Sequence, residues 1–180
     1  MKSAVLIIDM INDFVTGRFE NERAQKIVPN IKKLLETARS EKIPIIYVRD
    51  AHPEDDSEFD IWGPHAVAGS EGSEVIPELE SGEGEPVLDK TKYSAFFNTN
   101  LNSILENLEV EEVVLTGVLT DICIQHTAAD AFFRGYKVII PRECVDSLSD
   151  EENKRAIKFI EKMYGAEISN LKDLLEKMEA

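Results

Sequence analysis

Short apolar runs that alternate with segments of helical periodicity constrain the fold of this chain more than any other feature. The runs are continuous and rich in β-branched residues, which is typical of strands buried on both faces of a parallel sheet. They occupy Ala4–Ile8, Ile43–Val48, Pro86–Leu88, Glu112–Leu115 and Tyr136–Ile140, with Ala166–Ile168 as a weaker sixth candidate. The alternation predicts an α/β fold with a mostly parallel sheet and right-handed crossovers.

The segments between these runs carry apolar residues at helical spacing. Helices are predicted at Ala24–Ser40, Leu101–Leu108, Thr120–Arg134 and Ser149–Tyr164, and an amphipathic C-terminal helix over about residues 169–180. Within the fourth segment, Ser149 and Glu152 have the spacing of a capping box at a helix start. The length of 180 residues fits one domain spanning residues 1–180.

The charge balance argues against two classes of partner. The chain has 20 Lys and Arg against 35 Asp and Glu, a net charge of −15, so nucleic acid and anionic membranes are not expected to bind. We expect no signal peptide, because Asp9 and Asp13 interrupt the first apolar stretch, and no run reaches the ~20 residues that span a bilayer. With only two cysteines, the sequence predicts a reduced, cytoplasmic protein.

Polar and reactive residues follow the predicted strands at their carboxyl ends. The candidates, in chain order, are Asp9, Asp50, His52, Lys90 and Cys123. In open parallel sheets, ligands bind beyond the carboxyl ends of the strands. We therefore expect these residues to meet in one site.

Cys123 is the candidate nucleophile. It lies in the first turn of a predicted helix, where the positive end of the helix dipole stabilises a thiolate. Asp9 is placed to act as the base and Lys90 to lower the pKa of the thiol. The structural alternative is that Cys123 is a small buried hydrophobic residue, which we also expect of Cys144.

Asp50, His52 and His65 form a candidate metal site. Asp50 and His52 are two residues apart and project to the same side of an extended segment, and His65 lies in the long irregular stretch that follows. One carboxylate and two imidazoles suit a divalent ion such as Zn, Fe or Mn. The alternative is a pair of solvated loop histidines beside a capping Asp50. The third histidine, His126, is expected to be a packed or partly exposed helix residue.

Five segments in order resemble the isochorismatase-like cysteine hydrolase superfamily. They are LIIDMINDF, VRDAH, WGPHAVAGSEGSEV, VLDKTKYSAFFNTNL and TGVLTDICIQHTAADAFFRGY, within about residues 3–168. The resemblance implies a three-layer, doubly wound, six-stranded parallel sheet with helices on both faces, and a homo-oligomer. It also implies a catalytic triad of Asp9, Lys90 and Cys123, and a cis peptide between Val118 and Leu119. The backbone N–H groups of Leu119 and Cys123 would then form the oxyanion hole.

Among the members of this superfamily, the chain is most similar to nicotinamidases. That similarity implies one divalent metal on Asp50, His52 and His65, zinc being the first choice and iron or manganese the alternatives. The aromatic residues implied to sandwich a pyridine ring are Phe14, Trp62 and Tyr93. The implied reaction is hydrolysis of nicotinamide to nicotinate and ammonia through a thioacyl intermediate on the cysteine, with a role in NAD salvage.

Two features of the sequence differ from typical nicotinamidases and are compatible with other substrates. The segment from Lys90 to Tyr93 is short, as in the isochorismatase branch, and Ala66 follows His65 where nicotinamidases often have Cys. One alternative is a metal-free cysteine amidase that acts on a carbamoyl or ureido compound. Others are an isochorismatase-type hydrolase and a non-catalytic protein that binds a metabolite. In all the enzymatic alternatives the ligand is a small molecule.

Overall fold

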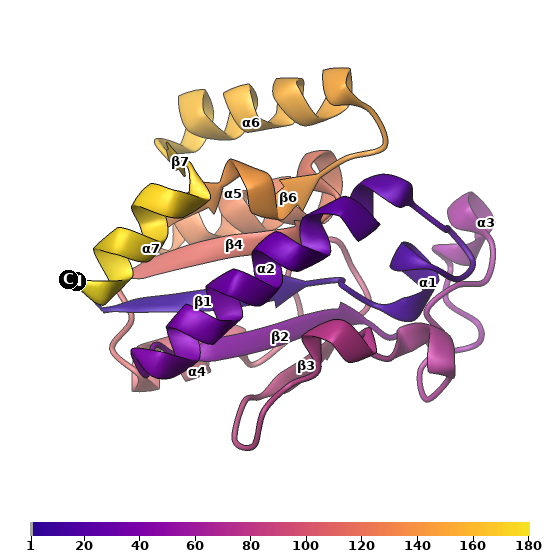
Figure 1. The fold of residues 1–180 in the computed structure, drawn as a ribbon. Helices are drawn as coiled ribbons and strands as arrows, with labels where there is room; N and C mark the ends of the chain where they lie inside the picture. The colour runs from indigo at the N-terminus through magenta and orange to yellow at the C-terminus, as the bar shows by residue number, and fades with distance from the viewer. Residues whose placement is uncertain (1) are drawn as a thin grey trace.

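A central parallel sheet organises the protein, and helices cover both of its faces (Figure 1). The computed structural model describes residues 2–180. Within them the strand order is β3-β2-β1-β4-β5-β7, and every adjacent pair is parallel. The strands are β1 (Ser3–Ile8), β2 (Ile45–Asp50), β3 (Val87–Lys90), β4 (Glu112–Val118), β5 (Lys137–Pro141), β6 (Val145–Asp146) and β7 (Glu167–Ser169).

The described residues form seven strands rather than the predicted six, because the two-residue β6 joins the sheet beside β4. Strand β5 pairs with β4 only as far as Val114 and Ile139. Further along β4, Gly117 and Val118 pair with β6 instead. The additional strand therefore fills the position beside β4 at the end of the sheet where the polar residues gather.

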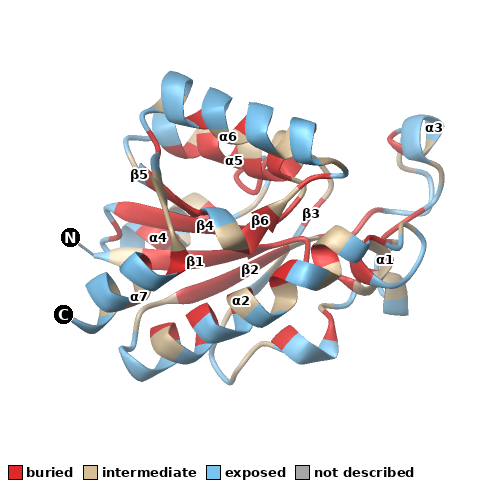
Figure 2. Ribbon diagram, turned by 45° about the horizontal axis from the view of Figure 1, so that its top comes forward, coloured by how far each residue is buried: buried red, intermediate tan, exposed pale blue. Residues whose placement is uncertain are grey.

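Alternate residues of the central strands face opposite helical layers. In β1, Leu6 and Ile8 pack in the cluster that includes residues of α4, α5 and α6. Val5 and Ile7 pack in the other cluster, with α2 and α7. Both faces are thus apolar, which explains the uninterrupted hydrophobic runs in the sequence. Figure 2 shows the buried strands between helices whose outer faces are exposed.

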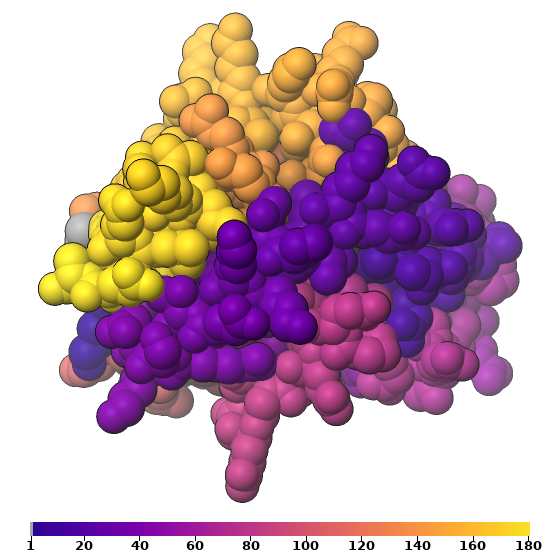
Figure 3. Space-filling view, viewed as in Figure 1, coloured from indigo at the N-terminus to yellow at the C-terminus, as the bar shows by residue number. Residues whose placement is uncertain are grey.

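The helices match most of the predicted segments. Their bounds are α1 (Asn12–Val15), α2 (Glu22–Ser40), α3 (Phe59–Trp62), α4 (Leu101–Asn107), α5 (Gln125–Phe133), α6 (Asp150–Tyr164) and α7 (Leu171–Glu179). Figure 3 shows α2 and α7 covering one face of the molecule side by side, and the two helices are in contact. Among the described residues, no helix has the length and apolar character needed to cross a membrane.

The helix predicted from Thr120 differs in its first turn. Residues Thr120–Ile124 form a π-helical turn (η3), and the α-helix α5 begins only at Gln125. Cys123 therefore lies in a π-turn, a feature that is frequent at functional sites. Before this turn, Gly117 has a φ of +111°, and a Cβ there would lie 1.9 Å from the Ile8 carbonyl oxygen. Only glycine fits at this position of β4, because a side chain would clash with the backbone of the paired strand β1.

The irregular segment between β2 and β3 covers the carboxyl ends of the strands. It contains α3 and the short 3-10 turns η1 (Glu71–Ser73) and η2 (Pro77–Leu79). Two isolated bridges hold it in place, between His52 and Val67 and between Ile11 and Val75. The segment is thus an ordered part of the site rather than a free loop.

Candidate active site

Lys90 is the centre of a buried charge cluster at the carboxyl end of the sheet. Its side chain is 1% exposed, and its Nζ lies 2.9 Å from Asp9 Oδ2 and in contact with Asp50 Oδ1. The same Nζ lies 3.6 Å from Cys123 Sγ. The structure therefore brings together the three residues of the expected triad and adds Asp50 as a second carboxylate on the lysine.

Strand register explains how these side chains meet. Asp50 and Lys90 are the last residues of β2 and β3 and are paired in register, so their side chains project to the same side. Both strands extend further toward the site than the sequence predicts. Asp9 follows β1 with a φ of +56°, and its Oδ1 accepts a hydrogen bond of 2.8 Å from the Asp50 N–H.

The charge cluster shifts the pKa values of its members. Burial raises the pKa of Asp9 to about 6, the nearby Asp50 raises it as well, and Lys90 acts in the opposite direction. Burial also raises the pKa of the Cys123 thiol well above its ordinary value; Asp9 and Asp50 add to this rise, and Lys90 opposes it. Lys90 thus lowers the thiol pKa as expected, but its effect is smaller than that of burial, and the net pKa of the thiol is raised. Because Cys123 is only 6% exposed, desolvation outweighs the effect of the lysine.

The peptide bond between Val118 and Leu119 is cis, as the resemblance implies. It lies between β4 and the π-turn of Cys123. Leu119 and Cys123 both line the cavity described below. The two backbone positions expected to form the oxyanion hole therefore border the same space.

Asp50, His52 and His65 converge beside the charge cluster. One ligand atom from each of the three lies within 4.8 Å of the others, and all three residues are buried. His52 Nδ1 lies 3.1 Å from Asp56 Oδ2, and His65 Nδ1 lies 2.7 Å from the Gly63 carbonyl oxygen.

Both Nδ1 contacts suit a neutral imidazole that carries its proton on Nδ1. In that tautomer the Nε2 lone pair is free for a metal. Among the described residues, the buried Nε2 of His52 has no hydrogen-bond partner. A buried imidazole nitrogen without a partner costs free energy unless something binds it. The donor set of two imidazoles and one carboxylate therefore fits a divalent cation.

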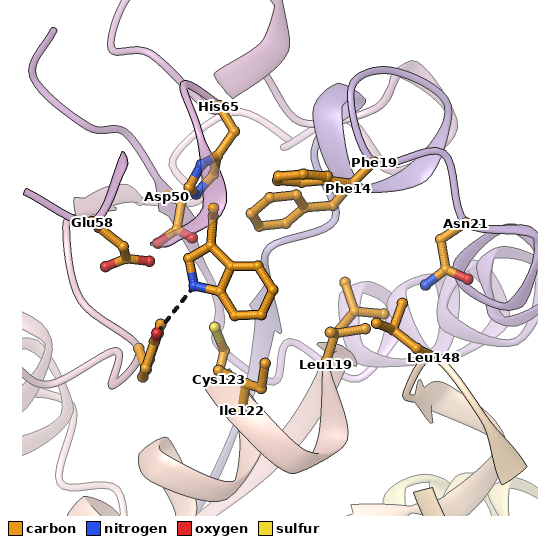
Figure 4. Close-up of a pocket in the computed structure, with 13 residues that line it drawn as sticks. Phe14, Phe19, Asn21, Asp50, Glu58, His65, Leu119, Ile122, Cys123 and Leu148 are labelled. Atoms are coloured by element: carbon orange, nitrogen blue, oxygen red, sulfur yellow. Dashed lines mark hydrogen bonds between the residues drawn. The ribbon is translucent and has the colours of Figure 1, made fainter. Parts of the chain in front are cut away.

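A cavity of about 170 Å³ is lined by Cys123 and by two of the three possible ligands, Asp50 and His65 (Figure 4). It is smaller than the roughly 300–1,000 Å³ of sites for drug-sized ligands, so it suits a small molecule. The lining residues are Phe14, Phe19, Asn21, Asp50, Glu58, Trp62, His65, Tyr93, Val118, Leu119, Ile122, Cys123 and Leu148.

The three aromatic residues expected to sandwich a ring all line this cavity. Trp62, on α3, is 39% exposed, and its Nε1 donates to the Tyr93 hydroxyl over 3.2 Å. Phe14 comes from α1, and its ring centroid is 5.8 Å from that of His65. His126, in contrast, is exposed on α5, and its Nδ1 contacts the Ile122 carbonyl oxygen rather than the cavity. Cys144 is buried and free.

Four residues near the cavity were not anticipated from the sequence. Asp56 orients His52, and hydrogen bonds with the Glu58 backbone N–H, His52 and Lys92 hold its pKa at about 2 against the effect of burial. Glu58, Phe19 and Asn21 line the cavity directly. They lie in loops or at helix ends, and only the acidic stretch around Asp56 gave any signal in the sequence.

The structure thus shows an open parallel sheet flanked by helices, with a buried cysteine, lysine and aspartate at the carboxyl ends of its strands. The isochorismatase domain family matches residues 3–173, so the chain belongs to the isochorismatase-like hydrolase family. The parallel sheet and the surrounding helices agree with the structures of that family.

Solved structures of amidases resemble this chain over nearly its whole length. N-carbamoylsarcosine amidase from Thermoplasma acidophilum is 40% identical, with a TM-score of 0.90 over 95% of this chain and 97% of that one. Nicotinamidase PncA from Bacillus subtilis is 30% identical, with a TM-score of 0.89 over 94% and 100%. Pyrazinamidase of Pyrococcus horikoshii, solved in complex with zinc, is 28% identical, with a TM-score of 0.87 over 94% and 99%.

Proposed function

We propose that this protein is an amidase that hydrolyses the C–N bond of a small amide through a thioacyl intermediate on Cys123, with nicotinamide as the leading substrate. The observation that carries the proposal is the contact of Cys123 Sγ with a lysine that also binds Asp9, at the base of a small cavity. A nucleophile, a base and an orienting cation within reach of one another are the parts that covalent catalysis requires.

Asp9 acts as the base in this proposal. With a pKa of about 6 it is mostly ionised at neutral pH, and it contacts the same lysine ammonium as the thiol does. As Sγ attacks the amide carbon, the thiol proton passes to Asp9 and then to the leaving nitrogen. The C–N bond breaks and ammonia leaves. Water, deprotonated by Asp9, then attacks the thioester, which releases the acid and restores the thiol.

Lys90 stabilises the negative charge that forms on sulfur. Burial alone would lower the pKa of Lys90, but Asp50 and Asp9 raise it well above its ordinary value, so the side chain stays protonated. Its charge lies close to Sγ throughout the reaction. The backbone N–H groups of Leu119 and Cys123 are proposed to bind the carbonyl oxygen as it becomes an oxyanion.

Asp50, His52 and His65 are the residues that would hold a divalent metal, zinc first and iron or manganese as alternatives. The free Nε2 of His52 supports this assignment. A bound ion would supply a Lewis acid for a ring nitrogen of the substrate, beside Cys123. Phe14, Trp62 and Tyr93 are proposed to pack against the ring.

A carbamoyl compound is the second candidate substrate. The 40% identity with an N-carbamoylsarcosine amidase favours it, since a carbamoyl group presents the same kind of carbonyl to Cys123. The same residues would perform the same steps. The two candidates differ in what holds the part of the substrate that does not react.

The test combines metal analysis and ammonia release on one sample purified without added metal. For the nicotinamide proposal we expect about one Zn or Fe per chain and ammonia release from nicotinamide. A His65→Ala variant is expected to lose the metal, whereas His126→Ala, with its exposed imidazole, keeps it. Turnover of an N-carbamoyl amino acid without turnover of nicotinamide would favour the second candidate. Turnover of neither contradicts the proposal.

A further inference from the structure

The cavity has a second polar end, formed by Asn21. This residue precedes α2, is only 8% exposed and lines the cavity. In Figure 4 it lies across the cavity from His65 and Asp50, with Phe14 and Leu119 between the two ends. No step of the proposed mechanism uses it. Its carboxamide oxygen caps α2, whereas the amide nitrogen has no role in that cap.

The orientation of the Asn21 amide is fixed by its role as the N-cap of α2. Its Oδ1 accepts a hydrogen bond of 3.0 Å from the Arg23 N–H. Because the oxygen is held on the side of the helix, the Nδ2 group faces the cavity, as Figure 4 shows. Within residues 2–180, no hydrogen bond partners this Nδ2. The cavity thus ends in a preorganised hydrogen-bond donor without an acceptor.

The surroundings of Asn21 favour an oxygen that carries negative charge. The α2 helix has 19 residues, and the amino end of such a helix carries about +0.5 of an elementary charge. The nearby Arg23 does not supply a free cation, since its guanidinium pairs with Asp146 and Asp150. The donor and the helix dipole therefore act together on a ligand atom, next to the apolar side chains of Leu119 and Leu148.

We propose that Asn21 forms a distal subsite that donates a hydrogen bond to a carbonyl or carboxylate oxygen on the non-reacting end of the substrate. The inference rests on the proposed function, because it takes Cys123 as the reacting end. Nicotinamide carries no oxygen other than that of its amide and would leave the Asn21 donor without a partner. Amides with a second oxygen function at the far end, such as N-carbamoyl amino acids, would engage both ends of the cavity.

Binding to a Cys123→Ala variant tests the subsite without any need for turnover. The two probes are N-carbamoylglycine and N-ethylurea, in which a methyl group replaces the carboxylate. Titration calorimetry is expected to show at least about tenfold tighter binding of N-carbamoylglycine, the effect of one hydrogen bond to a charged group. Adding Asn21→Asp keeps the oxygen that caps α2 but replaces the donor with a carboxylate, so the preference should vanish or reverse.

Two further variants separate the subsite from the stability of the helix. Asn21→Ser keeps a capping oxygen and replaces the amide donors by one hydroxyl on a shorter side chain, so it should weaken the preference while it remains folded. Asn170→Asp is the matched control. Asn170 caps α7 by accepting from the Asp173 N–H over 2.9 Å and does not line the cavity. That variant should retain the full preference.

The possible outcomes are distinct. Equal binding of the two probes, binding of neither, or a preference that survives in Asn21→Asp would overturn the subsite. Ammonia release by the wild-type protein is measured in parallel with both probes and with nicotinamide. If no amide is hydrolysed but the binding preference holds, the proposed function fails and the subsite stands. If amides are hydrolysed but the two probes bind equally well, the subsite fails and the proposed function stands.

Discussion

Replacing Lys90 by Met would remove the positive charge that holds two buried carboxylates together. Lys90 is 1% exposed, Asp9 is 0% and Asp50 is 3% exposed, and Lys90 Nζ lies 2.9 Å from Asp9 Oδ2. Removing one partner from such a buried group costs about 3–5 kcal/mol, because the remaining charges are left without compensation. In a chain of this size, 1 kcal/mol changes the melting temperature by about 2–4 °C. The expected fall for Lys90→Met is therefore about 6–20 °C.

Lys92→Met is the matched control, two residues further along. The Lys92 side chain is 42% exposed, and its Nζ lies 3.1 Å from Asp56 Oδ1. Solvent screens this pair, so its loss should cost at most about 1 kcal/mol, or about 4 °C. Thermal and denaturant unfolding of both variants at neutral pH measure the difference.

The pH dependence gives a second measurement on Lys90→Met. Without the lysine, the buried carboxylates of Asp9 and Asp50 have no cation beside them. Their folded-state pKa then lies above the unfolded value, so the native state binds the proton more tightly. The stability of this variant should then fall as pH rises through that folded pKa and recover toward acidic pH. Equal losses in Lys90→Met and Lys92→Met, or a loss below about 1 kcal/mol for Lys90→Met, would refute the buried charge cluster.

Three further predictions follow from the same contacts. Cys123→Ala should lower the rate of amide hydrolysis by a factor on the order of 10³ or more, measured as ammonia release; comparable turnover would exclude a thiol mechanism. Zinc added to metal-free protein should raise the melting temperature of the wild type but not that of His65→Ala, and an equal rise in both would place the ion elsewhere. Glu85→Gln should cost about 1 kcal/mol at pH 7, because Glu85 forms two hydrogen bonds of 2.8 Å with Arg39. Those hydrogen bonds hold the Glu85 pKa below its ordinary value, so this stabilisation is present above about pH 4.3 and fades as pH falls further; a difference in denaturant stability that persists at pH 3 would contradict the assignment.

The parallel sheet could be predicted because burial on both faces leaves a strong signal. Val5 and Leu6 contact different helical layers, and both must be apolar. The two-residue β6 left no such signal, since Val145 and Asp146 join the sheet only where β5 has left β4. The π-turn at Cys123 could not be predicted either, because helical periodicity does not distinguish a π-turn from the first turn of an α-helix.

The gathering of the site residues followed from one rule about strand ends, whereas their electrostatics did not. The rule placed Asp9, Lys90 and Cys123 at the same edge of the sheet. The degree of burial was not predictable from the sequence, and burial is what raises the thiol pKa. Residues such as Glu58 and Asn21 reach the cavity from loops and helix ends, where sequence periodicity carries no information about side-chain direction.

Trapping the acyl-enzyme shows whether Cys123 is the nucleophile. The protein is mixed with nicotinamide or N-carbamoylglycine, quenched in acid within the first turnover, and analysed by intact-protein and peptide mass spectrometry. We expect an adduct with the mass of the substrate's acyl group on Cys123 and none on Cys144. Hydroxylamine should discharge the adduct, and its amount should equal that of the first ammonia released. Ammonia release with Cys123 unmodified at every time point, or undiminished release by Cys123→Ala, would contradict this role of Cys123.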